Sequence, residues 1–286
     1  RQNQAKVIAS LEKLDFMAVQ EIFMTETAKL ADVVLPATTF AEKDGTFTNT
    51  ERRVQRVRKA VDPPGQAKPD WEILCLVSTA MGHPMSYAHA GEVFDEMASL
   101  TPSYGGMSYE RIDEVGLQWP CPSPDHPGTR FLHENRFTRG LGAFQEIDYR
   151  PAAELPDEDY PYILSTGRTL YNYNLGNMTQ KVGAIRQKQH RNFVEMHMQD
   201  AAGLGVAYGD DVTVATRRGE LTVRARVGQR TRPGALWMPF HFVDEPTNRI
   251  TNDAFDNITR TAEYKVCAAR VTKAAAPSRS GAAEPS

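Results

Sequence analysis

The pattern of hydrophobic and polar residues divides the chain into a first half with α/β character and a second half rich in strands. An apolar run at 16–23 is followed by a short helical segment at 25–30 and a second apolar run at 31–35, which ends at Pro36. A strand, a helix and a strand in this order predict a parallel α/β sheet whose second strand is buried. Ligands bind such sheets beyond the carboxyl ends of their strands, so loop residues there are candidates for a site.

Helical periodicity predicts further helices around this sheet. The apolar residues of 1–14 share one helical face, and Asp70 stands where an N-cap is expected for a following helix. Segment 51–59 carries five basic residues and one acidic residue. A nucleic-acid patch is one interpretation, but we favour a strand with a solvated basic face. The other helices are predicted at 71–81, 92–100 and 109–115.

The second half begins with a connector and continues as a series of short strands. Proline and glycine are frequent from 119 onward, which predicts a connector with a few short strands at a domain boundary. Alternating residues on both sides of 217–219 predict a hairpin, and several such strands indicate a small closed barrel. The strands are expected at 162–165, 212–216, 221–227, 235–242 and 264–271, and the parts of the chain at 1–118, 119–158 (connector), 159–273 and 274–286 (disordered tail).

Composition and charge exclude several classes of function. The formal net charge is −3, so no global basic field attracts nucleic acid, and no run of about 18 apolar residues predicts a membrane span. Cys75, Cys121 and Cys267 are far apart, which argues against a zinc ribbon, an iron–sulfur site or a disulfide framework in this chain. We therefore expect packing thiols in a reducing, cytoplasmic location. The start at Arg1, without an initiator methionine, suggests a part of a longer protein.

The residues alone indicate polar loops suited to a nucleotide-like ligand. Thr166, Gly167 and Arg168 follow a predicted strand, where glycine permits close backbone approach and arginine suits a phosphate. An ordinary polar loop would look similar. Asn248 lies in a second polar cluster that Asx turns would also explain. No nucleotide-binding glycine motif, nucleophile elbow or metal-binding histidine spacing is present. We interpret His241 as a core or rim residue.

Four separated stretches resemble a known family. Thr25–Pro36 and Glu42–Gln55 are similar to the molybdopterin oxidoreductase family, while Tyr162–Arg168 and Ile258–Val271 resemble its dinucleotide-binding domain. The order and spacing agree, and the resemblance extends to about Lys273. It implies part of a parallel α/β domain followed by a small six-stranded β-barrel of the double-psi type.

Two further stretches narrow the resemblance. Within the family, Gln20–Thr25 and Trp119–Pro122 are most similar to formate dehydrogenase alpha subunits. The implied cofactor is bis(molybdopterin guanine dinucleotide), with molybdenum or tungsten. By resemblance, one dinucleotide is bound by Gln20, Glu21, Lys43 and Asp70. The other is bound by Thr166, Gly167, Arg168, Thr169, Leu170, Tyr171, Asn172, Tyr173, Asn174, Leu175, Phe240, Asn248 and Lys265.

The resemblance also implies what this chain lacks. The family's iron–sulfur cysteines, its metal-ligating cysteine or selenocysteine and its active-site histidine and arginine belong to an N-terminal region that no segment here matches. We therefore expect no catalytic residue in this chain and no activity from it alone. At Asn172 and Asn174 the family often has histidine and serine or threonine, so cofactor contacts there are expected to differ.

The implied reaction of the whole enzyme is oxidation of formate to carbon dioxide, or its reversal. Electrons would leave through iron–sulfur clusters toward an acceptor subunit, so the expected partners are the rest of the alpha subunit and electron-transfer subunits. Two alternatives stay open: another member of the family such as nitrate reductase, and a non-catalytic binding or assembly module. The formate interpretation requires polar side chains of both halves, Asp70 and Lys265 among them, to meet one long phosphate-bearing ligand.

Overall fold

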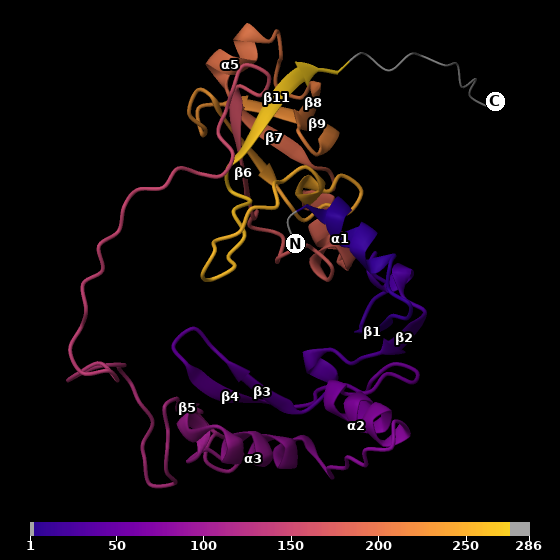
Figure 1. The fold of residues 1–286 in the computed structure, drawn as a ribbon. Coiled ribbons are helices and arrows are strands. Elements are labelled where there is room, and N and C mark those ends of the chain that lie inside the picture. The colour runs from indigo at the N-terminus through magenta and orange to yellow at the C-terminus, as the bar shows by residue number, and fades with distance from the viewer. Residues whose placement is uncertain (1–2, 275–286) are drawn as a thin grey trace, which may run out of the picture. The chain divides into compact units, whose positions relative to one another are not determined.

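The computed structural model describes residues 3–274, and the chain divides into two compact units (Figure 1). The first, called the α/β unit here, contains 15–147. The second, called the barrel unit, combines the first 14 residues with the chain from 148 onward. The predicted disordered tail falls, from residue 275, outside the described residues.

The α/β unit begins with two parallel strands, β1 (Ala18–Glu21) and β2 (Val33–Pro36), in which Gln20 lies opposite Leu35. This pair confirms the predicted parallel arrangement. The prediction that the second strand is buried is wrong, since Val33 is 41% exposed and no residue of β2 is buried. Within the described residues this sheet has only two strands, so neither β1 nor β2 is flanked by strands on both sides.

An antiparallel sheet and two helices form the rest of the α/β unit (Figure 1). The predicted basic strand is present as the central strand of this sheet, and its Val54 is 1% exposed in a core with Phe94, Ile112 and Cys121. The elements are β3 (Gly45–Thr48), β4 (Arg53–Val57), β5 (Leu117–Gln118), α2 (Asp70–Ala80) and α3 (Ala90–Leu100).

Two predictions for this region are wrong. Residues 109–115 form turns rather than a helix, because the Arg111 side chain donates to the carbonyl oxygens of Gly106 and His126 and Ile112 is drawn into the core. The connector contains no strand within its described residues, only an isolated bridge between Phe137 and Gly140. Its prolines lack the backbone N–H that a ladder needs.

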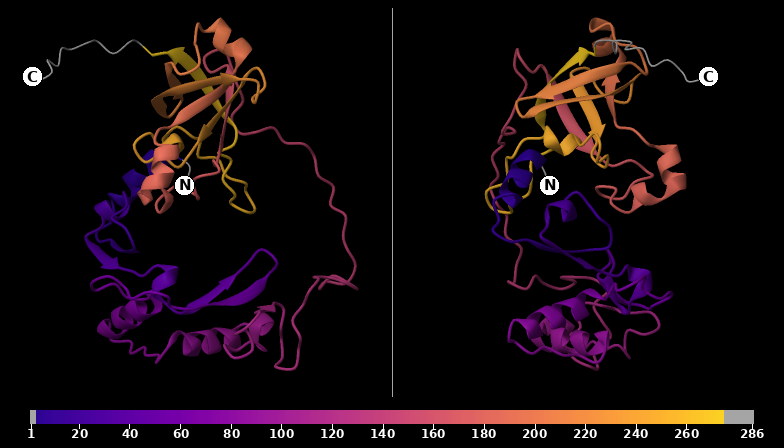
Figure 2. Two further views of the ribbon diagram at one scale, coloured as in Figure 1. Left: turned by 180° about the vertical axis from the view of Figure 1, so that it is seen from behind. Right: turned by 90° about the vertical axis from the view of Figure 1, so that its right-hand side faces the viewer.

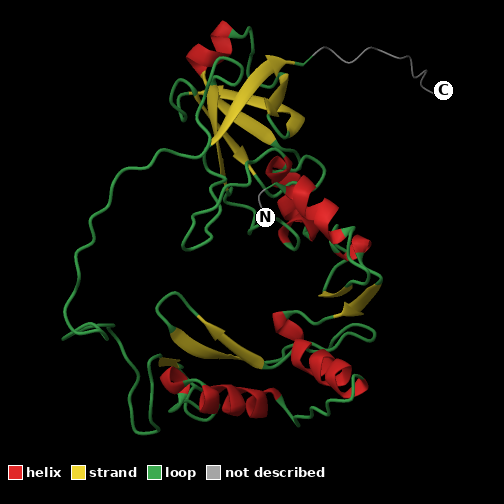
Figure 3. Cartoon of the chain, viewed as in Figure 1, coloured by secondary structure: helices red, strands yellow, loops and turns green. Residues whose placement is uncertain are grey.

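The barrel unit contains a closed six-stranded barrel, in the order β10-β6-β11-β8-β9-β7 (Figures 2 and 3). Pairs β10–β6 and β7–β9 are parallel, and the others are antiparallel. The closed barrel confirms the expected fold class. Its strands are β6 (Tyr162–Gly167), β7 (Phe193–His197), β8 (Asp211–Thr216), β9 (Gly219–Gly228), β10 (Ala235–Pro239) and β11 (Cys267–Lys273).

Alternating residues of β8 and β9 supply part of the barrel core. The predicted hairpin joins β8 and β9, with Thr216 opposite Gly219. Val212 and Val214 face inward from β8, and Val223 from β9, all at 0% exposure. Side chains two residues apart on a strand share one face, so this period places the valines in one core and leaves the intervening residues outside.

Short helices complete the barrel unit. Helix α1 (Gln4–Leu11) is attached to the barrel by an ion pair between Lys6 and Asp253 at 2.7 Å. The other helices are α4 (Gly183–Lys188) and α5 (Met198–Gly203). Single 3₁₀ turns occur in both units. In the α/β unit they are η1 (Ala28–Leu30), η2 (Phe40–Glu42) and η3 (Pro102–Tyr104), and in the barrel unit η4 (Thr179–Lys181) and η5 (Thr247–Arg249).

All three cysteines are buried and form no disulfide, in agreement with their expected role in packing. Within residues 3–274 no helix has the length and apolar character needed to cross a membrane. Over the same residues no group of three or more histidine, cysteine, aspartate or glutamate side chains is arranged to hold a metal ion.

Candidate functional site

Strand direction gathers three of the predicted segments at one end of the barrel. Strands β6 and β10 run parallel, with Gly167 opposite Pro239, so the chain leaves both strands at the same end. Strand β11 is antiparallel to β6, so the residues that precede it return to that end. We call this end the rim and define it as residues 166–175, 240–248 and 264–265.

Arg168 and Lys265 bring two positive charges together on the rim. The Arg168 guanidinium donates hydrogen bonds of 2.8 and 3.2 Å to Asn174 Oδ1 and lies 5.4 Å from the centre of the Phe240 ring. Lys265 Nζ donates to the backbone carbonyl of Thr166. Burial, and then repulsion by the Arg168 charge, lowers the pKa of Lys265. Neither cation forms an ion pair with any carboxylate of residues 3–274, so both are available to an anion such as phosphate.

Asn248 supplies a buried polar group that lacks a partner. It is 5% exposed, and its Oδ1 accepts no hydrogen bond from the described residues. A buried acceptor without a donor is unfavourable, and the N–H groups of a pterin or guanine could satisfy it. Phe240 is also nearly buried and meets Tyr264 edge-on at 6.4 Å. These rim residues therefore fit a heteroaromatic ligand that also carries phosphate.

The side chains of two predicted contact residues form hydrogen bonds within the protein. The Asn172 side chain is 5% exposed, and its amide donates to Gln189 Oε1 at 3.2 Å while its oxygen accepts from Gln180 at 2.5 Å. The buried Thr166 hydroxyl donates to the carbonyl of Tyr264 at 3.2 Å. These two side chains hold the rim in shape together with bonds of the neighbouring backbone, in which the Thr166 carbonyl accepts a hydrogen bond from Lys265 and the Tyr173 N–H donates one to the Thr179 hydroxyl.

The remaining residues of 166–175 line an open loop. A Cβ on Gly167 would lie 2.6 Å from Trp237 Nε1, which explains why glycine is required at the end of β6. Leu170 and Tyr173 are 91% and 74% exposed. The loop therefore presents large side chains that the barrel unit itself does not cover. Its other members are Thr169 and Leu175, both half-buried, and Tyr171, which is exposed.

A second group of predicted residues meets in the α/β unit. Asp70 Oδ1 accepts from Gln20 Nε2 at 2.7 Å, and its other oxygen pairs with Lys43 Nζ. These bonds join the carboxyl end of β1 to the start of α2. The prediction that Asp70 is the N-cap is wrong, because Pro69 occupies that position and Asp70 is the first helical residue. Glu21 turns back to accept from the N–H of its neighbour Ile22 at 2.9 Å.

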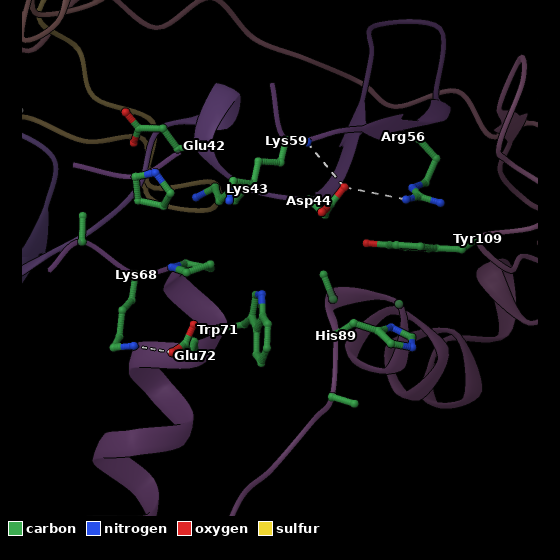
Figure 4. A pocket seen from close by; sticks show the side chains of 16 residues that line it. Glu42, Lys43, Asp44, Arg56, Lys59, Lys68, Trp71, Glu72, His89 and Tyr109 are labelled. Carbon is green, nitrogen blue, oxygen red and sulfur yellow. Dashed lines mark hydrogen bonds and ion pairs between the residues drawn. The ribbon is translucent and has the colours of Figure 1, made fainter. Parts of the chain in front are cut away.

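Beside Lys43 the α/β unit contains a cavity of about 490 Å³ (Figure 4). Trp71 and Tyr109 contribute aromatic rings to its wall, and the Tyr109 hydroxyl points into it. Arg56 and Lys68 contribute positive charge. Arg56 pairs with Asp113 and Lys68 with Glu72, and Glu42 and Asp44 also line the wall, so the cavity adds aromatic faces beside Lys43 rather than free positive charge.

The Asp70 ion pair should make a small, pH-dependent contribution to stability. Burial raises the pKa of Asp70, but hydrogen bonds from Lys43 and Gln20 and the Lys43 charge outweigh it, so the pKa is lowered overall. A carboxylate whose pKa is lower in the folded state stabilises the fold at pH values above its ordinary pKa of 3.8. This stabilisation is lost as the pH falls through the folded-state pKa. We expect Asp70→Asn to cost under about 1 kcal/mol at pH 7, since the carboxylate is half-exposed.

Urea unfolding of the wild-type and variant chains at several pH values measures this difference. Glu26→Gln is a matched control, because Glu26 pairs with Lys29 on a more exposed surface of the same unit. A difference between wild type and Asp70→Asn that stayed constant from pH 7 to well below 3.8 would contradict the assignment of the ion pair.

Gln189 and Tyr264 were not predicted as site residues, and His241 was expected only as a core or rim residue. All three bond or pack against predicted residues. Gln189 lies in a polar segment without periodicity, so no pattern distinguishes it from a solvated residue. Tyr264 directly precedes Lys265, which was predicted as a site residue. An aromatic residue next to a lysine was the sequence signal that could have identified it.

Family models match both units. Residues 1–80 match the model described as molybdopterin oxidoreductase, and residues 162–268 match the molydopterin dinucleotide binding domain, which includes most of the barrel and all of the rim. The chain belongs to the molybdopterin oxidoreductase family. The rim is therefore part of the domain for which dinucleotide binding is described.

Relatives agree with this assignment. The chain is 51% identical over 268 residues to the F420-dependent formate dehydrogenase 2 subunit alpha of Methanococcus maripaludis, covering 92% of this chain and 40% of that protein. It is 36% identical over 282 residues to the assimilatory nitrate reductase catalytic subunit of Bacillus subtilis, covering 94% and 40%. The chain thus spans about two fifths of the length of these molybdopterin oxidoreductase relatives.

A solved structure agrees with the fold. Acetylene hydratase from Pelobacter acetylenicus superposes with a TM-score of 0.70 at 20% identity, over 96% of this chain and 42% of that chain. At this level of identity the likeness concerns the fold alone.

Proposed function

We propose that this chain is the C-terminal, cofactor-binding portion of a formate dehydrogenase alpha subunit that uses bis(molybdopterin guanine dinucleotide). The observation that carries the proposal is the pair Arg168 and Lys265, which has no carboxylate partner in residues 3–274 and belongs to the same rim as the unsatisfied amide of Asn248. Identity of 51% to a formate dehydrogenase subunit, against 36% to a nitrate reductase subunit, favours formate.

Each group of residues has a role suited to its chemistry. In the barrel unit, Arg168 and Lys265 would bind the pyrophosphate of one dinucleotide, and Asn248 Oδ1 would accept a hydrogen bond from an N–H group of its heterocycle. In the α/β unit, Lys43 and Asp70 would bind the second dinucleotide: the lysine suits a phosphate, and the carboxylate suits a guanine edge or ribose hydroxyls. The assignment of each group to one dinucleotide, and the domain limits given above, are parts of this proposal.

The bound cofactor supplies a molybdenum or tungsten centre at which formate loses two electrons and a proton to become carbon dioxide. This chain's residues bind and orient that cofactor and provide no catalytic group. We propose that the metal ligand and the iron–sulfur cysteines belong to other parts of the alpha subunit, that electrons pass to an acceptor subunit, and that this chain alone is inactive. The unpaired cysteines support a cytoplasmic location.

The deciding experiment uses the full-length protein that contains this chain. We expect purified protein to release an oxidised, fluorescent pterin together with guanine nucleotide, and to reduce a dye with formate. Because the Methanococcus relative is named as F420-dependent, F420 is the first physiological acceptor to test. Pterin release with nitrate reduction and no formate oxidation would favour the second candidate, a nitrate reductase, which the 36% identical relative supports. Protein that retained a partner but no pterin would instead be a binding or assembly module.

A further inference from the structure

His241 lies directly beneath the rim loop. It follows strand β10, its side chain is 0% exposed, and its ring packs 4.6 Å from that of Phe242. Its backbone also contacts the far end of the loop, because a Cβ on Gly176 would approach His241 O to 2.7 Å. A fully buried imidazole in this position requires either a packing role or a hydrogen-bonding role.

The hydrogen bonds around His241 determine which ring nitrogen carries the proton. His241 Nε2 lies 3.2 Å from Thr169 Oγ1, and the Thr169 hydroxyl donates its only proton to Gln189 Oε1 at 2.6 Å. The Thr169 oxygen must therefore accept from His241, so Nε2 carries a hydrogen and Nδ1 does not. Consistent with this tautomer, Nδ1 is buried and has no partner among the described residues.

The bond to Thr169 belongs to a network in which two series of donors converge on Gln189 Oε1. Gln189 Oε1 accepts from both Thr169 and Asn172 Nδ2, the latter at 3.2 Å. The Asn172 oxygen in turn accepts from Gln180 Nε2 at 2.5 Å and from the Thr179 hydroxyl at 3.1 Å. Apart from His241 Nδ1, the atoms named here all have hydrogen-bond partners, and such a buried network favours a single conformation of the segment that contains it.

The network requires a neutral histidine. Burial lowers the pKa of His241 to about 4, so the ring is uncharged at neutral pH. An uncharged ring with a hydrogen only on Nε2 is a fixed donor to Thr169, whereas a charged ring would place an uncompensated proton on the buried Nδ1.

We infer that His241 is a positioning residue that, through Thr169, Gln189 and Asn172, holds residues 169–175 in the conformation that binds the pterin dinucleotide. This inference rests on the proposed function for the identity of the ligand. The conformational part concerns the chain itself and is measurable without cofactor.

Four variants of this chain separate a hydrogen-bonding role from packing. His241→Leu and Thr169→Val remove the bond, while His241→Gln and Thr169→Ser keep a donor or acceptor in place. We expect backbone amide hydrogen exchange in 170–176 to become about 2- to 10-fold faster in the first two variants and to stay near wild type in the other two. The double variant His241→Leu with Thr169→Val should exchange no faster than Thr169→Val alone, since that single variant already removes the bond to His241 together with the bond to Gln189.

Nitrogen NMR of the His241 ring should show a protonated Nε2 and a bare Nδ1 between pH 6 and 8. A protonated Nδ1, unchanged exchange in His241→Leu, or an increase spread evenly over the barrel would overturn the positioning role.

In the full-length enzyme, pterin content should fall in His241→Leu and recover in His241→Gln. A wild-type enzyme without pterin would contradict the proposed function but leave the exchange result standing, whereas unaltered pterin content in His241→Leu would overturn this inference alone.

Discussion

Replacing both Arg168 and Lys265 with alanine in the full-length enzyme is expected to remove nearly all bound pterin. Each cation can make charge-assisted hydrogen bonds to phosphate, and such bonds contribute about 1.5–3 kcal/mol each. Each single variant should therefore weaken cofactor retention roughly 10- to 100-fold, with a larger loss in the double variant. Pterin content per protein after extensive dialysis, measured by fluorescence of the released oxidised pterin, tests this directly.

The matched control is Lys188→Ala, which removes an exposed lysine of helix α4 that also has no ion pair among the described residues. It should leave pterin content unchanged. Equal losses in the control and in the Arg168 and Lys265 variants would mean that total charge matters rather than the rim. Full pterin content in the double variant would contradict the assignment of the phosphate-binding site.

The second large effect concerns Glu154, which joins the chain before the barrel to strand β11 and to the turn between β8 and β9. Its carboxylate accepts hydrogen bonds from both terminal nitrogens of the Arg218 guanidinium, of which the bond from Nη2 measures 2.9 Å. It also accepts a hydrogen bond of 2.7 Å from the backbone N–H of Ala268. The Glu154 and Arg218 side chains are only 13% and 16% exposed. Glu154→Ala leaves the arginine charge nearly buried without a partner, and we expect it to cost about 3–5 kcal/mol of unfolding free energy.

Chemical denaturation of this chain, followed by the fluorescence of Trp237 in the barrel, measures the cost. Asp157→Ala is the control, because Asp157 pairs with Arg217 but is 45% exposed, and its loss should cost under about 1 kcal/mol. A Glu154→Ala chain as stable as the control variant would show that the buried pair contributes little.

The pH dependence of this pair has a definite sign. Burial raises the pKa of Glu154, but the hydrogen bonds from Arg218 and Ala268, with the charges of Arg218 and Arg217, lower it overall. The stabilisation is therefore complete above the ordinary value of 4.5 and is lost as the pH falls through the lower folded-state value. The stability difference between wild type and Glu154→Gln should accordingly narrow in acid.

Sequence patterns predicted those elements whose signals are local. The β8–β9 hairpin followed from alternation across a two-residue turn, and α2 and α3 followed from helical periodicity. Strand β7 was missed, because it is only five residues long, Glu195 interrupts its apolar residues, and its partners β9 and β10 lie later in the chain. Residues 109–115 were predicted as a helix because periodicity cannot report that Arg111 bonds loop carbonyls instead.

The site could be predicted only in part, because the contacts among its residues join positions that are far apart in the sequence. Lys265 contacts Thr166 across 99 residues, and His241 contacts Thr169 across 72. Only resemblance to a family identified Lys265 beforehand, since no spacing rule links residues so far apart. The hydrogen bond that gives His241 its tautomer depends on the positions of Gln189 and Thr169 in the folded barrel, which no pattern in the sequence reveals.

The position of β11 between β6 and β8 determines when the barrel can be completed during synthesis. The ring of hydrogen bonds remains open until Cys267–Lys273 has emerged from the ribosome, although β6 was made about a hundred residues earlier. Lys265 reaches Thr166 only at that moment. The proposed dinucleotide site on the rim is therefore among the last features of this region to form, and we expect loading of the cofactor to follow translation of these residues.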